Sequence, residues 1–176
     1  MNNGIRTTLL LLAVTLSSPA SFALEVGQSA PAGLQAASEQ GEALSVDAFA
    51  GQVVYVDFWA SWCAPCLQAM PEYEALYQKY RDQGFTVLAV NVDTHHRAAL
   101  KTLQRIKVSY PVVFDPDGQW PDAYQVKAMP SAYLIGRDGR VQWVQPGFRS
   151  AELPQIEAAI TAAVQQPGAA SQEREP

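Results

Sequence analysis

Apolar residues along this chain fall into short continuous runs and into stretches where they recur every three or four positions. Residues 53–59, Val-Val-Tyr-Val-Asp-Phe-Trp, are almost free of polar side chains, and residues 85–93 have the same character. Such runs predict strands that are buried on both faces. Between them, apolar side chains at helical spacing predict an amphipathic helix over residues 63–81, with a kink at Pro71.

The rest of the pattern adds shorter elements in the same alternation. Two apolar runs around a Gly-Arg-Asp-Gly turn predict a β-hairpin. The further strands are expected at 44–46, 112–114, 131–135 and 141–144, and the further helices at 97–107, 120–126 and 153–164. Strands that alternate with helices and end in a hairpin predict an α/β fold, in which helices cover both faces of a mixed central β-sheet.

Both ends of the chain differ from the part between them. Residues 1–23 combine one basic residue, an apolar run and small residues before Leu24, which is the layout of a secretory signal peptide. The run is shorter than the roughly 20 residues that cross a membrane. We therefore expect cleavage near Leu24 and a periplasmic protein, with an uncleaved N-terminal membrane anchor as the alternative. Residues 166–176 are rich in Gln, Pro, Ala and charge and predict a disordered tail, which leaves residues 24–165 as the folded domain.

Composition and charge narrow the classes of function. The 176 residues are 48% apolar and 16% charged, which suits one globular domain. The formal net charge is −5, and an acidic protein is not attracted to the phosphate backbone of nucleic acids. We therefore expect no nucleic-acid partner.

The chain has two cysteines, Cys63 and Cys66, and both lie at the expected start of the first helix. A disulfide between residues so close in sequence constrains the unfolded chain very little, so a reactive pair explains them better than a structural one. A helix N-terminus favours a thiolate, so we expect Cys63 to be the nucleophile of disulfide exchange. Cys66 lies one turn inward and can resolve the mixed disulfide. Pro65 removes one N–H near the helix start at little cost and stiffens the turn.

The segment Val-Asp-Phe-Trp-Ala-Ser-Trp-Cys-Ala-Pro-Cys at 56–66, followed downstream by Met129-Pro130-Ser131, resembles the thioredoxin superfamily, and above all its exported TlpA/ResA-like branch. The resemblance implies a three-layer thioredoxin-like fold. It also implies a thiol–disulfide oxidoreductase that exchanges disulfides with exported proteins through the cysteine pair, without a further cofactor. The branch consists mostly of reductants. Apocytochrome c is a candidate substrate, and a membrane thiol carrier of the DsbD type is the expected electron donor.

The same resemblance implies a substrate-binding surface around the cysteines. Pro130 matches the cis-proline of the superfamily, and the backbone of Met129 beside it can pair with a substrate strand. Trp62 is expected on the exposed rim. Ala64 and Pro65, between the cysteines, are the other residues expected to meet the substrate.

Asp57 matches the buried acid of the superfamily behind the second cysteine. Burial should raise its pKa, and the carboxylate can then take a proton from Cys66. Two neighbours depart from the family pattern. Ala89 stands where cytosolic thioredoxins have a lysine, and Thr94 stands where ResA-like proteins have a glutamate.

Two other readings of the cysteine pair stay open at this point. Two thiolates can hold a soft ion such as Cu(I), although no third ligand lies near in sequence. A thiol peroxidase uses one attacking cysteine on the same fold, although a Trp-Cys-x-x-Cys segment suits disulfides better than peroxides. Oxidoreductase, metal-binding module and peroxidase are therefore the three classes to separate.

Overall fold

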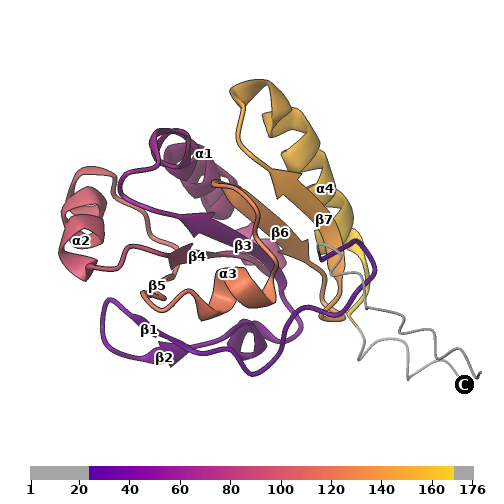
Figure 1. The fold of residues 1–176 in the computed structure, drawn as a ribbon. Coiled ribbons are helices and arrows are strands. Elements are labelled where there is room, and N and C mark those ends of the chain that lie inside the picture. The colour runs from indigo at the N-terminus through magenta and orange to yellow at the C-terminus, as the bar shows by residue number, and fades with distance from the viewer. Residues whose placement is uncertain (1–23, 169–176) are drawn as a thin grey trace, which may run out of the picture.

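The two long apolar runs form neighbouring parallel strands at the centre of one mixed sheet (Figure 1). The computed structural model describes residues 24–168, so the expected signal peptide and residues 169–176 of the expected tail lie outside the described residues. In chain order the elements are β1 (Ala36–Ser38), β2 (Ala43–Leu44), a 3-10 helix (Val46–Phe49), β3 (Val53–Trp59), α1 (Ala64–Tyr80), a 3-10 turn (Arg81–Gln83), β4 (Phe85–Asn91), α2 (His96–Arg105), β5 (Val112–Phe114), α3 (Gln119–Ala123), β6 (Ser131–Ile135), β7 (Val141–Pro146), a 3-10 turn (Ser150–Glu152) and α4 (Leu153–Gln165).

The seven strands have the order β2-β1-β5-β4-β3-β6-β7. β3, β4 and β5 are parallel, whereas β6 and β7 form the expected antiparallel hairpin beside β3. β3 therefore has a parallel neighbour on one side and an antiparallel one on the other. This arrangement confirms the expected α/β fold with a mixed central sheet.

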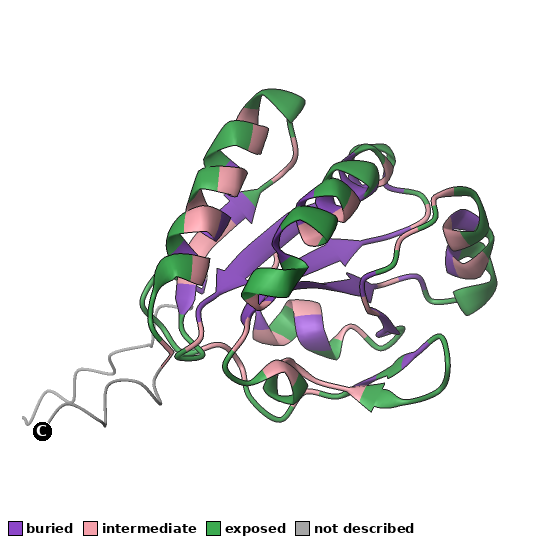
Figure 2. Cartoon of the chain, turned by 180° about the vertical axis from the view of Figure 1, so that it is seen from behind, coloured by how far each residue is buried: buried purple, intermediate pink, exposed green. Residues whose placement is uncertain are grey.

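Helices cover both faces of the sheet (Figure 2). Successive side chains of β3 point to opposite faces, so the strand contributes to an apolar cluster on each side. Tyr55 and Trp59 belong to the apolar cluster that includes the buried faces of α1 and α4. Phe58 points the other way and belongs to a second cluster with Trp120 of α3. Every residue of β3 is buried, as the nearly continuous apolar run predicts. Asp57 shares the α1 side of the strand with Tyr55 and Trp59.

Of the strand expected at 44–46, only Leu44 lies in a strand. Leu44 ends β2, and Val46 begins a 3-10 helix. The sequence does not predict β1, which lies between the edge strand β2 and β5, because its residues Ala-Ala-Ser carry no clear apolar alternation.

Other boundaries differ from the expected ones by a few residues. β4 ends at Asn91 rather than at residue 93, and α2 begins one residue early. α1 begins at Ala64 and continues as one helix past Pro71. Within residues 24–168 none of the helices is long and apolar enough to cross a membrane.

Candidate active site

The two cysteines lie where the central strand β3 gives way to helix α1. β3 ends at Trp59, and after a short turn Cys63 is the N-cap residue of α1. Cys63 and Cys66 form a disulfide with their Cα atoms 5.3 Å apart. The helix therefore sets the spacing of the two sulfurs, and the strand sets the position of the helix.

The two sulfurs have different surroundings at the start of α1. The backbone N–H of Cys66 donates a hydrogen bond of 3.3 Å to Sγ of Cys63. Cys66 is fully buried, and its Sγ lies 4.0 Å from the carbonyl oxygen of Phe58, while Cys63 retains 4% exposure. A donor and a helix N-terminus aimed at Cys63 favour its thiolate after reduction, and burial disfavours charge on Cys66. Cys63 is thus the better nucleophile of the pair.

The turn that leads to the cysteines is hydrogen-bonded to a buried carboxylate that follows the neighbouring strand β4. Asp93, just beyond the end of β4, accepts hydrogen bonds from the Ser61 backbone N–H at 2.9 Å and from the Ser61 hydroxyl at 3.0 Å. The side-chain amide of Asn91 donates to the same carboxylate at 2.9 Å, and Asn91 Oδ1 accepts from the Asp93 N–H at 3.1 Å. The sequence predicts a role for neither Ser61 nor Asp93. The available signal was an acid directly after the Val-Asn-Val strand.

Asp57 is the buried acid on the α1 side of β3. Its side chain is almost completely enclosed, and neither carboxyl oxygen has a hydrogen-bond partner among the described residues. Burial raises the pKa of Asp57 from 3.8 to about 8. At neutral pH the group is therefore mostly protonated in the oxidised protein.

Three tyrosines are close enough to this carboxyl for its charge to act on them, and no basic side chain among the described residues contributes to its raised pKa. The hydroxyl of Tyr55 donates to the hydroxyl of Tyr73 at 3.4 Å, and the two rings pack edge to face. Burial raises the pKa of Tyr55, Tyr73 and Tyr110, and the charge of Asp57 raises it further. All three therefore stay neutral, and a tyrosine carries no positive charge in either state, so none of them offsets a negative charge on Asp57. Thr94, at the position where ResA-like proteins have a glutamate, is exposed.

The expected substrate-binding residues lie near the C-terminal end of β3, where the turn to the cysteines begins. Trp62 is 69% exposed, and the two residues between the cysteines are exposed as well. The Met129–Pro130 peptide bond is cis, and it directly precedes β6. Because Ser131 pairs in register with Phe58, this segment lies beside the end of β3, where the turn to the cysteines begins. The register of β3 and β6 thus brings together residues that are far apart in sequence.

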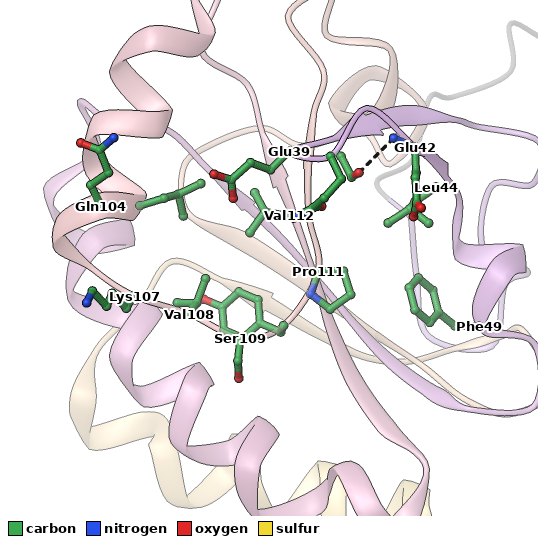
Figure 3. Close-up of a pocket in the computed structure, with 14 residues that line it drawn as sticks. Glu39, Glu42, Leu44, Phe49, Gln104, Lys107, Val108, Ser109, Pro111 and Val112 are labelled. Atoms are coloured by element: carbon green, nitrogen blue, oxygen red, sulfur yellow. Dashed lines mark hydrogen bonds between the residues drawn. The ribbon is translucent and has the colours of Figure 1, made fainter.

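Hollows of the surface lie away from the cysteines. One of about 660 Å³ lies between the β1–β2 turn and the chain that enters β5, and Figure 3 shows Glu39, Lys107 and Pro111 among its walls. Neither cysteine lines it. The redox pair instead lies beside a protruding tryptophan, which suits contact with another protein better than enclosure of a small ligand.

A soft-metal site at the cysteine pair is one of the alternatives that the sequence leaves open. Residues 24–168 contain no group of three or more His, Cys, Asp or Glu side chains that could hold a metal ion. In this part of the chain, a soft ion at Cys63 and Cys66 would have two sulfur ligands and no third ligand of these types.

Two sulfurs one helical turn apart can be oxidised and reduced as a pair, which is the chemistry of thiol–disulfide oxidoreductases. Residues 25–160 match the family model described as Redoxin. The ResA thiol-disulfide oxidoreductase of Geobacillus thermodenitrificans is 33% identical over 156 residues, which cover 84% of this chain and 89% of the relative. ResA of Bacillus thuringiensis is 30% identical over 118 residues, 67% of this chain and 68% of the relative.

Solved structures give the same result. A crystal structure assigned as the thiol:disulfide interchange protein DsbE of Chlorobium tepidum superposes with a TM-score of 0.77 at 40% identity, covering 80% of this chain and 99% of that one. The chain therefore belongs to the Redoxin family, as a TlpA/ResA-like thiol–disulfide oxidoreductase of the thioredoxin superfamily. The resemblance read from residues 56–66 is confirmed.

Proposed function

We propose that this protein is an exported reductant, whose Cys63–Cys66 dithiol reduces disulfides in other exported proteins. The observation that supports it most directly is the pairing of an activated sulfur with a buried one. Cys63 accepts a backbone N–H at the helix start, and Cys66 is enclosed one turn further on. The direction of electron flow rests on the likeness to the TlpA/ResA-like branch, whose members mostly act as reductants.

The first step is attack by the Cys63 thiolate on a substrate disulfide. A bond forms between Sγ of Cys63 and one substrate sulfur, and the other substrate sulfur leaves as a thiolate. The product is a mixed disulfide. Because Cys66 is fully buried, whereas Cys63 retains 4% exposure and accepts a backbone N–H at the helix start, we assign the attack to Cys63.

The second step frees the reduced substrate. Asp57, as carboxylate, takes the proton of the Cys66 thiol, directly or through water, and the resulting thiolate attacks Sγ of Cys63. The second substrate sulfur leaves as a thiolate, and the Cys63–Cys66 disulfide forms. Two electrons have passed from the dithiol to the substrate. The carboxyl of Asp57, buried and without a hydrogen-bond partner among residues 24–168, supports this role, because its raised pKa of about 8 lies close to that of a thiol.

Substrate binding is assigned to the surface around the disulfide. Trp62 offers an exposed apolar face, and the backbone of Met129 beside cis-Pro130 offers hydrogen bonds to an extended substrate segment. Ala64 and Pro65 face the substrate from the helix side. An extended peptide bound there would hold its disulfide near Cys63.

The cellular setting follows from the N-terminal sequence. Residues 1–23 have the layout of a signal peptide, so we propose a periplasmic location. A reductant in an oxidising compartment needs a continuing supply of electrons. We propose a membrane thiol carrier of the DsbD type as the donor and apocytochrome c as one substrate.

A trapping experiment tests the proposed function. The Cys66→Ser variant should accumulate mixed disulfides with partner proteins on non-reducing gels, and Cys63→Ser should accumulate none. Wild-type protein should reduce insulin, and Cys63→Ser should not. A Cys66→Ser variant that forms no adducts would refute the resolving role. Peroxide consumption that persists in Cys66→Ser would favour the peroxidase instead.

A further inference from the structure

The carbonyl oxygen of Pro130 accepts a hydrogen bond from a glycine at the end of the neighbouring strand β7. Gly147 follows β7, and its backbone N–H donates a hydrogen bond of 2.8 Å to the Pro130 carbonyl oxygen. Gly147 has φ of 78°, in the left-handed region, and a Cβ added there would meet no atom within 4 Å. Backbone conformation, rather than lack of space, therefore calls for glycine here.

A buried amide holds this glycine in turn. Gln145 is 4% exposed and projects from β7, and its Nε2 donates to the carbonyl of Gly147 at 3.3 Å. The same nitrogen donates to Glu152 Oε2 at 2.9 Å, and Gln145 Oε1 accepts from Trp143 Nε1 at 3.2 Å. Arg149 pairs with the other oxygen of Glu152. Both ends of the Gln145 amide are thus satisfied, which fixes its orientation.

We infer that Gln145 is a positioning residue for polypeptide substrates: through Gly147 it fixes the Pro130 carbonyl and the Met129–Pro130 backbone that a substrate strand would pair with. The inference rests on the proposed substrate-binding role of Met129 and Pro130. It concerns docking of an extended chain, since no hydrogen bond of Gln145, Gly147 or Glu152 reaches Cys63 or Cys66. A small disulfide needs only an accessible sulfur, so its exchange does not depend on this network.

The test compares a protein disulfide with a small one. Gln145→Met keeps the volume and removes the amide. It should raise the KM for insulin by roughly threefold to tenfold with little change in kcat, because the segment that positions Pro130 loses one to two hydrogen bonds. The rate constant for the reaction of the reduced protein with 5,5′-dithiobis(2-nitrobenzoate) should stay within about twofold of wild type.

A matched control lies on the same strand. The amide of Gln142 also makes a side-chain hydrogen bond, to Gln166 at 2.8 Å, at the far end of β7 from Pro130. Gln142→Met should leave the KM for insulin unchanged. If Gln145→Met lowers the rates with insulin and with the small disulfide equally, the network acts on the cysteines and the inference is wrong.

A pair of glycine variants keeps the test independent of Gln145. Gly139 in the β6–β7 turn has φ of 74° and the same open space around an added Cβ as Gly147. Gly147→Ala and Gly139→Ala introduce similar strain, yet only Gly147→Ala should raise the KM for insulin. An equal change in both, or none in either, would overturn the inference.

Glu152 supplies the conservative variant. Glu152→Gln keeps an oxygen that can accept from Gln145 and should keep the wild-type KM, whereas Glu152→Ala should raise it. Wild-type protein that fails to reduce insulin would overturn the proposed function and this inference with it. Wild-type activity with an unchanged KM in the Gln145 and Gly147 variants would overturn the inference alone.

Discussion

Asp57 on β3 lies directly opposite Ala89 on the parallel neighbour β4. The two residues share a register position, and alanine offers the carboxyl neither charge nor a hydrogen bond. The position is the one at which cytosolic thioredoxins have a lysine. The raised pKa of Asp57 therefore reflects burial without compensation.

The first prediction concerns the pH dependence of stability. Folded Asp57 keeps its proton up to about pH 8, whereas the unfolded carboxyl loses it near 3.8. Between these values the folded state binds more protons, so the group makes the free energy of unfolding fall by about 1.4 kcal/mol per pH unit. Asp57→Asn removes this contribution. Its stability advantage over wild type should be small near pH 4 and grow to several kcal/mol near pH 8.

Urea denaturation of the oxidised proteins at several pH values measures this difference. Other titrating groups contribute equally to both proteins and cancel. A difference that stays constant between about pH 4 and 8 would show that Asp57 is ionised or paired in the folded protein.

The second prediction concerns the resolving step. With a pKa of about 8, roughly a tenth of the Asp57 groups are ionised at pH 7. A general base contributes about 100-fold or more to such a proton transfer. A thionitrobenzoate adduct on Cys63 reports the step, because attack by Cys66 releases the coloured thiol. Asp57→Asn should slow the release strongly at pH 7 and much less at high pH, where Cys66 ionises unaided. Parallel pH profiles for the two proteins would assign Asp57 to packing.

The third prediction concerns the turn before the cysteines. Ser61→Ala removes one hydrogen bond and should lower the free energy of unfolding by about 1 kcal/mol. Asp93→Ala also leaves the Ser61 N–H and the Asn91 amide without their acceptor, so it should lower stability by about 3 kcal/mol. Chemical denaturation compares the two variants. Equal losses would mean that Asp93 contributes through the Ser61 hydroxyl alone.

The fourth prediction concerns the end of the sheet away from the disulfide. The Arg137 guanidinium donates to the carbonyls of Gly51 at 2.8 Å, Gln83 at 2.7 Å and Val164 at 3.2 Å. It thereby joins the chain just before β3 to the 3-10 turn that follows α1 and to the end of α4. Arg137→Met should lower the free energy of unfolding by about 1–2 kcal/mol, and with it the melting temperature. Insulin reduction should stay unchanged. Arg137→Lys should recover little, because lysine lacks the planar fork that reaches several acceptors.

The elements around the site could be predicted from the sequence because burial leaves a pattern in it. β3 is buried on both faces, so its residues read as one apolar run. Asp57 stands out in that run because a carboxyl there is rare. β1 left no such pattern, and the strand expected at 44–46 shares only Leu44 with β2, since backbone hydrogen bonds near a sheet edge place little demand on side chains.

The polar networks could not be predicted from the sequence for a different reason. Ser61 and Asp93 are 32 positions apart, and only the pairing of β3 with β4 brings them together. Gln145 and Gly147 are ordinary residues in a sequence, and their relation to Pro130 depends on the register of β6 with β7. Local patterns predict elements, whereas these contacts depend on how the elements align.

Cys63 is at once the N-cap of α1 and half of the disulfide. Reduction turns its sulfur into a thiolate, which accepts the Cys66 N–H more strongly and so stabilises the reduced fold. Folding and electron uptake then share one thermodynamic cycle, and a fold that favours the reduced form makes its disulfide easier to reduce. The contact that activates the nucleophile therefore weakens the reductant. Two unfolding curves, one for each redox state, measure how far folding shifts the reduction potential from that of the unfolded chain.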